Sequence, residues 1–204
     1  KDEFVTAETA KYVLVNLDFS ESKYQAAQVD ETASATEKKA AEKAHKQLDE
    51  NMNVATYYSV QMSPTFYLTS KEGYYITQLV FDDTLSSVEG FEQEIASHEE
   101  EINTFTETLA RTTQGSNLEK VSAIDDMYSI TDRRFAYLLA PLAREALKLD
   151  PKNESGITNK FIVELAQVEA TEAALSNDVE KMIAVFVKAA ENKLLSAEQK
   201  QQMY

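Results

Sequence analysis

The segment Val60–Ile76 (VQMSPTFYLTSKEGYYI) contains two apolar stretches joined by a short polar turn. Pro64 stands at the start of the first stretch, a position that suits proline because it has no backbone N–H to donate to a sheet ladder. The bond before a proline is also the one peptide bond in which the cis form costs only about 0.5–1 kcal/mol. We therefore expect a hairpin over 65–70 and 74–81, with Gly73 in the turn and a cis bond before Pro64.

The residues on both sides of this hairpin predict an alternation of strand and helix. Lys11–Phe19 is nearly continuous in β-branched and aromatic residues, a pattern typical of a strand buried on both faces. We expect a loop over Ser20–Ser34, with some order around Tyr24, and a helix over Thr36–Asn51, which is rich in helix formers. Ser86–Glu89 reads as a capping box, and apolar residues then recur at helical spacing from Val88 to Leu109.

The chain beyond Gly115–Asn117 is predicted to be entirely helical. We expect helices over 118–130, 132–149, 156–175 and 179–191, and a terminal helix from Ser196. Pro141 lies inside the second of these, where it either kinks one helix or starts a new one. Asp150–Asn153 is a helix stop. The later helices carry stripes that indicate the core of a helical hairpin, with a groove for a partner as the alternative: Phe161, Ile162, Leu165, Val168, Ile183, Phe186 and Val187.

Composition narrows the classes of function. The chain has 204 residues, which suits one or two domains, and a net charge of −15, which disfavours nucleic acid and anionic membranes as partners. No apolar run approaches the roughly 18 residues that a membrane-spanning helix needs, so we expect no membrane insertion. The chain has no cysteine and two histidines, His45 and His98, so we expect no metal and no cofactor. The three carboxylates after His98, Glu99–Glu101, point in different directions on a helix and indicate a solvated acidic face.

Two stretches resemble a known family. Tyr57–Phe66 (YYSVQMSPTF) is similar to the cis-proline segment of thioredoxin-like thiol–disulfide oxidoreductases, and Ala146–Gly156 resembles the helical C-terminal extension of some bacterial members, or a link between tetratricopeptide-type helix pairs. The resemblance implies an α/β fold: a thioredoxin-like sheet over residues 1–113, incomplete at its N-terminus, followed by an all-α extension over 114–204. The family's first strand and Cys-x-x-Cys helix would precede Lys11, so we expect the chain to be a fragment or another segment to complete the sheet.

The same resemblance implies a candidate site. In the family, the residues around the cis-proline offer their backbone to an extended substrate peptide, so Ser63, Pro64 and Thr65 would bind a peptide by β-augmentation. Asp18, at the end of the first expected strand, could assist proton transfer to a thiol, or could simply be satisfied by water and backbone. Enzymatic activity would require a Cys-x-x-Cys upstream of Lys1. Family members of this kind are often extracytoplasmic.

Three functions therefore remain open at the level of sequence. The first is a thioredoxin-family protein that is redox-inactive in these residues and binds peptides beside Pro64. The second is a non-enzymatic interaction protein whose helical extension docks a protein partner. The third is a dimerisation module in which a second copy completes the sheet, which would make the protein a homo-oligomer.

Overall fold

The computed structural model describes residues 12–13, 15–80, 82, 85, 87–201 and 203. Within these residues the chain is mostly helical, and its two strands form a single two-stranded antiparallel sheet. The chain divides into two compact units, Lys1–Phe66 with Val80–Glu94, and Tyr67–Leu79 with Ile95–Tyr204. The predicted boundary after Thr113 lies in the turn between two helices of the second unit.

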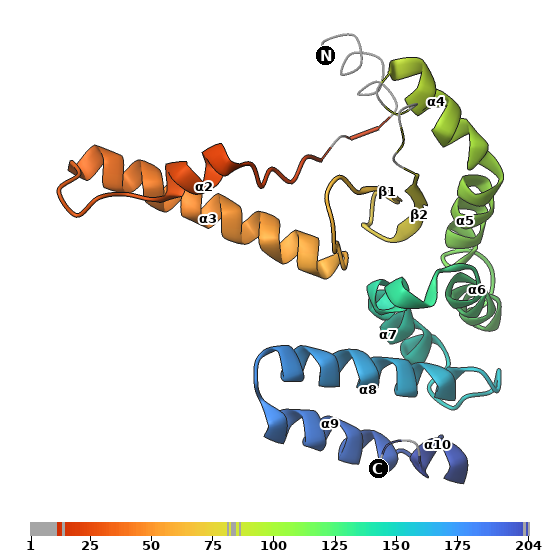
Figure 1. Cartoon of the computed structure of the whole chain (residues 1–204). Helices are drawn as coiled ribbons and strands as arrows, with labels where there is room; N and C mark the ends of the chain where they lie inside the picture. The colour runs from red at the N-terminus through yellow and green to blue at the C-terminus, as the bar shows by residue number, and fades with distance from the viewer. Residues whose placement is uncertain are drawn as a thin grey trace. The chain divides into compact units, whose positions relative to one another are not determined.

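The first unit is built around a helical hairpin, in which α2 (Glu21–Ala27) lies along α3 (Ala35–Tyr57) (Figure 1). A capping box starts α3: the Ser34 Oγ accepts from the Glu37 backbone N–H, and the Glu37 carboxylate accepts from the Ser34 N–H at 2.8 Å. Three residues of α3 are buried, Ala41, Asn51 and Ala55. The long helix is thus largely solvent-exposed within its own unit.

The hairpin expected around Pro64 is confirmed. The Ser63–Pro64 bond is cis, β1 spans Phe66–Thr69 and β2 spans Tyr75–Leu79. Gly73 has a φ of 86°, a left-handed conformation that glycine adopts without steric cost, and the Ser70 N–H donates to the Tyr74 carbonyl across the turn.

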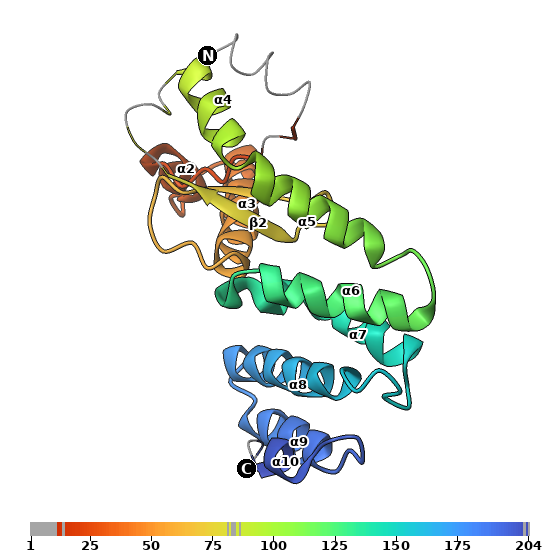
Figure 2. The ribbon, with the colours of Figure 1, turned by 90° about the vertical axis from the view of Figure 1, so that its right-hand side faces the viewer.

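A succession of helices forms the rest of the described chain. These are α4 (Val88–Ser97), which runs from the first unit into the second, α5 (Glu99–Arg111), α6 (Asn117–Ile130), the 3₁₀ helix η2 (Arg133–Leu139), α7 (Ala140–Leu149), α8 (Thr158–Leu175), α9 (Val179–Ala190) and α10 (Ala197–Gln201). From α5 to α9 each α-helix packs against the next one along the chain (Figure 2). The core of this stack holds Val121, Ile124 and Phe161, whose side chains are fully buried. The predicted helices beyond residue 117 are therefore confirmed.

The connection between α7 and α8 is fixed by one buried carboxylate. Asp150 is 3% exposed and accepts hydrogen bonds from the backbone of Glu154 and Ser155 and from the hydroxyls of Ser155 and Thr158. Burial alone would raise the pKa of Asp150, but these hydrogen bonds outweigh it and lower the pKa to about 2. The predicted helix stop is confirmed, and Pro141 starts α7 rather than kinking a longer helix.

The predicted thioredoxin-like α/β fold is wrong. A thioredoxin-like layer needs the Tyr12–Phe19 segment as a strand beside the hairpin, yet none of its described residues is in a strand, and the sheet contains β1 and β2 alone. Lys11 and Leu14 lie outside the described residues. Val13 is 92% exposed and Val15 is 76% exposed. Strand propensity reflects packing on a pleated, half-buried surface, and these residues have no such surface.

Two smaller expectations also need correction. The segment Ser20–Ser34 is not all loop, because the order expected around Tyr24 takes the form of the helix α2, Glu21–Ala27. The helix expected from Val88 to Leu109 is interrupted at His98, which separates α4 from α5. None of the helices in the described part of the chain has the length and apolar character needed to cross a bilayer.

Candidate protein-interaction surface

The residues predicted to bind a peptide lie at the entrance to β1. Ser63 and Pro64 are exposed and Thr65 is half-buried, with its hydroxyl donating to the Met62 carbonyl at 2.6 Å. This bond closes a tight local turn just before the strand begins. Peptide binding at Ser63, Pro64 and Thr65 stays a prediction, and the thioredoxin-like sheet that motivated it is not present.

Asp18 lies in an extended segment before α2 and not at the end of a strand. Its carboxylate accepts from the Ser20 backbone N–H at 2.9 Å, and the Lys23 ammonium lies 3.9 Å away. The backbone and side-chain hydrogen bonds from Ser20, together with the Lys23 charge, lower the pKa of Asp18 below its ordinary value. Asp18 therefore forms a local turn with the start of α2, and its role as an auxiliary acid stays a prediction.

A shallow pocket of about 360 Å³ lies in the second unit, beside the start of α5. Ile76, Phe105 and Ile130 supply its apolar lining, and His98 and Glu101 supply part of its polar lining. The His98 Nδ1 lies 3.0 Å from a Glu101 carboxylate oxygen, so the imidazole is already engaged by a neighbour on its own helical turn. Among the described residues, no three His, Asp or Glu side chains come together in a way that could hold a metal ion.

The most distinctive surface of the second unit is a row of exposed aliphatic side chains on α9. Val179, Ile183 and Val187 are four residues apart and are 59%, 54% and 41% exposed. Residues at this spacing lie above one another on a single helix face. We call this row the α9 stripe. Scattered exposed aliphatics are ordinary on protein surfaces, but three aligned on one helix form a continuous apolar ridge.

The part of the apolar face of α9 next to the stripe is fixed to the helical stack. Ala189 and Ala190 are buried in a small cluster with Ile162 and Ala166 of α8, and Phe186 packs against the same cluster. Small side chains at this contact let the two helices approach closely, and they run side by side (Figure 1). The start of α9 is capped by Asp178, which accepts from the Lys181 backbone N–H at 2.9 Å. The α9 stripe is therefore presented by a helix that is held at its start and along one face.

No family model, curated protein or solved structure matches this chain. The functional argument therefore depends on the chain's own geometry. In that geometry the α9 stripe is an exposed, aligned apolar surface on an ordered helix.

The sequence pattern of α9 predicts a buried environment for two residues of the α9 stripe that the structure exposes. Ile183 and Val187 were expected in the core of a helical hairpin, and the structure exposes both, whereas Phe161, Ile162 and Leu165 are buried as expected. The signal that could have separated them is the width of the apolar face of α9. Apolar residues cover more than half of its circumference: Val179, Met182, Ile183, Val185, Phe186, Val187, Ala189 and Ala190. One neighbouring helix cannot cover a face of that width.

Proposed function

We propose that this protein is a non-enzymatic protein-interaction module that docks a helical segment of a partner protein on the α9 stripe. The observation that supports the proposal is the alignment of Val179, Ile183 and Val187 along one exposed strip of a helix that packs against the stack through the neighbouring part of its apolar face. An amphipathic helix laid against such a ridge is a recurring mode of peptide recognition, and it is read through anchors at spacings of three and four residues.

The arrangement of the helices supports the same function. Each α-helix from α5 to α9 contacts its neighbour along the chain, as in helical repeat proteins, where stacked helices bury a continuous core. The α9 stripe leaves aliphatic surface exposed beside this packing, so a further helix laid on it would extend the contact already made between neighbouring helices.

The estimated binding energy suits a transient contact rather than a permanent one. Fully burying one Val or Ile side chain contributes about 1.5–3 kcal/mol, and each residue of the α9 stripe has about half of its surface left to bury. Association itself costs at least about 4 kcal/mol. The stripe alone therefore gives weak binding, and flanking contacts of the partner decide the final affinity. Because α9 is already ordered, little further entropy is lost from this side of the contact.

A selection from a displayed library of randomised helical peptides tests the proposal on the full chain. We expect peptide families that bind the wild-type chain, protect the backbone amides of α9 from hydrogen exchange and lose at least about tenfold in affinity on Ile183→Glu. Met52→Glu is the matched control, because Met52 is a similarly exposed apolar residue of α3, and it should leave binding unchanged.

Two further measurements keep this experiment decisive. Circular dichroism should show the same helix content in Ile183→Glu, Met52→Glu and wild type, because both positions are exposed. If every selected peptide binds Ile183→Glu as well as it binds wild type, or if protection falls outside α9, the proposed function is wrong.

A further inference from the structure

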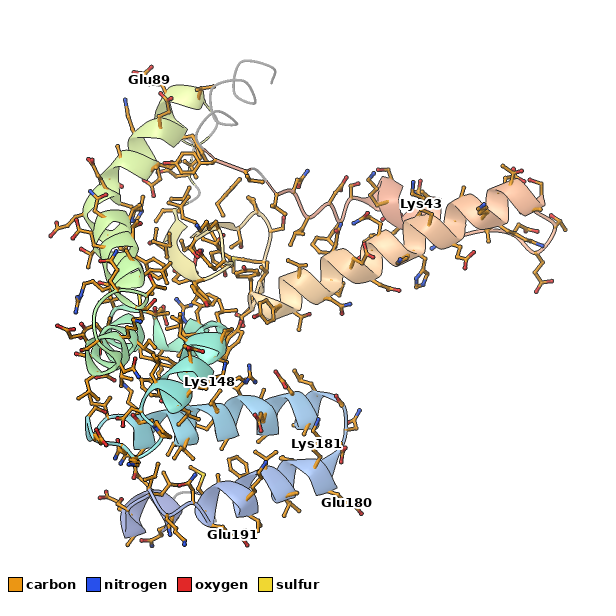
Figure 3. All side chains as sticks on the ribbon, turned by 180° about the vertical axis from the view of Figure 1, so that it is seen from behind. Lys43, Glu89, Lys148, Glu180, Lys181 and Glu191 are labelled. Carbon is orange, nitrogen blue, oxygen red and sulfur yellow. The ribbon has the colours of Figure 1, made fainter. Side chains whose placement is uncertain are left out.

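Two carboxylates border the α9 stripe along one side. Glu180 and Glu191 are both exposed and lie eleven residues apart, which is about three turns and about 16 Å of helix rise. At 3.6 residues per turn they fall on nearly the same line, next to the line of Val179, Ile183 and Val187. Figure 3 shows both side chains extending from the side of α9 that faces away from α8.

The carboxylates of Glu180 and Glu191 are both exposed to solvent. Within the described part of the chain, the side chains of Glu180 and Glu191 make no ion pair and no hydrogen bond. Lys181 and Lys188 lie further round the helix, beyond the line of the two glutamates. A partner that covers the α9 stripe would therefore meet two unpaired negative charges at its edge.

The other side of the stripe offers no comparable charge. Ala190, which lies in line with the stripe three residues after Val187, is buried in the cluster that includes Leu195 and Met203, so the segment after α9 covers the end of this face and the open part of the stripe ends at Val187. Phe186 packs against the same cluster and continues the apolar surface. The polar border of the stripe is thus one-sided and acidic.

We propose that the partner segment is an amphipathic helix whose apolar face is bordered on one side by two Lys or Arg residues about three turns apart. This inference rests on the proposed docking function of the α9 stripe. Basic side chains at that spacing would meet Glu180 and Glu191 while the aliphatic faces meet each other. The net charge of −15 on the chain further favours the approach of a basic segment.

A second copy of this chain fits the surface poorly. If two α9 helices paired antiparallel about a twofold axis, Glu180 of one copy would lie near Glu191 of the other, and like charges would meet at both ends of the contact. The two chains would also bring equal net charges of −15 together. Charge complementarity therefore selects a basic partner over self-association.

The test compares two synthetic helical peptides of about 20 residues, or about 30 Å of helix. Both carry the same leucine face at spacings of three and four residues, and they differ only in two flanking residues about three turns apart, which are Arg in one peptide and Glu in the other. Fluorescence polarisation with the full chain should show at least about tenfold tighter binding of the Arg peptide at low salt. The difference should shrink as salt screens the charges.

Charge reversal on the protein provides the matched comparison. The double variant Glu180→Lys with Glu191→Lys should invert the preference, so that the Glu peptide binds more tightly. The control variant Glu107→Lys with Glu154→Lys changes the net charge by the same amount at exposed residues away from α9, and it should keep the preference for the Arg peptide.

The outcomes separate this inference from the proposed function. If both peptides bind equally and Ile183→Glu abolishes both, the basic-partner inference is wrong while the docking function stands. If neither peptide binds, both are wrong. If sedimentation shows a dimer that Ile183→Glu dissociates, the occupant is a second copy and the inference is overturned.

Discussion

The helices α3 and α8 differ in what holds them together. α3 has 23 residues, of which three are buried, whereas α8 has 18 residues, of which seven are buried. α3 is packed against α2, and its Asn51 amide donates to the Asp18 carbonyl at 3.1 Å. Its other support is local: a capping box and surface pairs such as His45 with Asp49 at 3.0 Å. Such pairs contribute about 0.2–0.5 kcal/mol each. α8 is stabilised mainly by burial in the stack. α3 depends more on local contacts and on the helix propensity of its residues.

Removing a core ring from α8 should have the largest effect. Phe161 is fully buried, and the centroid of its ring lies 5.4 Å from the centroid of the Tyr128 ring. Phe161→Ala should lower the free energy of unfolding by about 3–5 kcal/mol, because it leaves a cavity in a packed core. Urea unfolding followed by circular dichroism measures the change.

The paired control for that substitution lies on α3. Met52 is 49% exposed, and Met52→Ala should change the free energy of unfolding by no more than about 0.5 kcal/mol. Equal losses in Phe161→Ala and Met52→Ala would show that the contrast between α3 and α8 is wrong.

The Asp150 carboxylate should make the stability of the second unit depend on pH. Its pKa is lowered to about 2 in the folded chain, so the unfolded chain binds more protons below pH 4. The contribution is about 2 kcal/mol; it is fully present above about pH 5 and is lost as the pH falls through the ordinary Asp pKa towards 2.

Asp150→Asn isolates this contribution from those of the other acids. The variant keeps the shape of the side chain but presents an amide to backbone N–H donors, so it should lose about 2 kcal/mol at pH 7 and nothing further from this site in acid. The difference between the unfolding free energies of wild type and variant should shrink from pH 5 to pH 2. A difference that stays constant over that range would contradict the assignment, and Glu107→Gln, at an exposed residue, should show no difference at any pH.

The sequence predicted the elements that carry their own local signals. The cis-proline hairpin follows from Pro64 and Gly73, the start of α6 from the boundary over Gly115–Asn117, and the end of α7 from Asp150–Asn153. In each case the residues next to the boundary make the hydrogen bond or adopt the dihedral angle that defines it. Segments of this kind are determined within a few residues of the chain.

The sheet and the candidate site could not be predicted in the same way, because both depend on what lies opposite. Val13 and Val15 have high strand propensity, but a strand also needs a partner strand and a buried face. Ile183 and Val187 have the spacing of core residues, and only the position of α8 decides that Phe186 is covered while they are not. Glu180 and Glu191 become informative only once the exposed stripe beside them is known.

α3 and α6 begin with the same kind of capping box, so removing each cap compares a helix with little burial to a helix with much burial. Ser34 with Glu37 starts α3 and Ser116 with Glu119 starts α6, and in both the glutamate accepts from the serine N–H, at 2.8 Å and 2.7 Å. Replacing either serine by alanine should cost about 1 kcal/mol of helix stability. Because α6 buries Val121, Ile124 and Met127 in the stack, Ser116→Ala should lower the unfolding midpoint of the second unit.

Ser34→Ala should instead destabilise only the first turns of α3. Since α3 has little burial to hold its first turns, we expect faster hydrogen exchange of the amides of residues 35–40 and a small loss of helical circular dichroism, with the midpoint of the second unit unchanged. Native-state exchange by NMR resolves the two patterns residue by residue. A different result would contradict this prediction: unchanged hydrogen exchange of residues 35–40, together with a midpoint lowered as much as in Ser116→Ala. It would show that tertiary packing, and not the capping box, holds the start of α3.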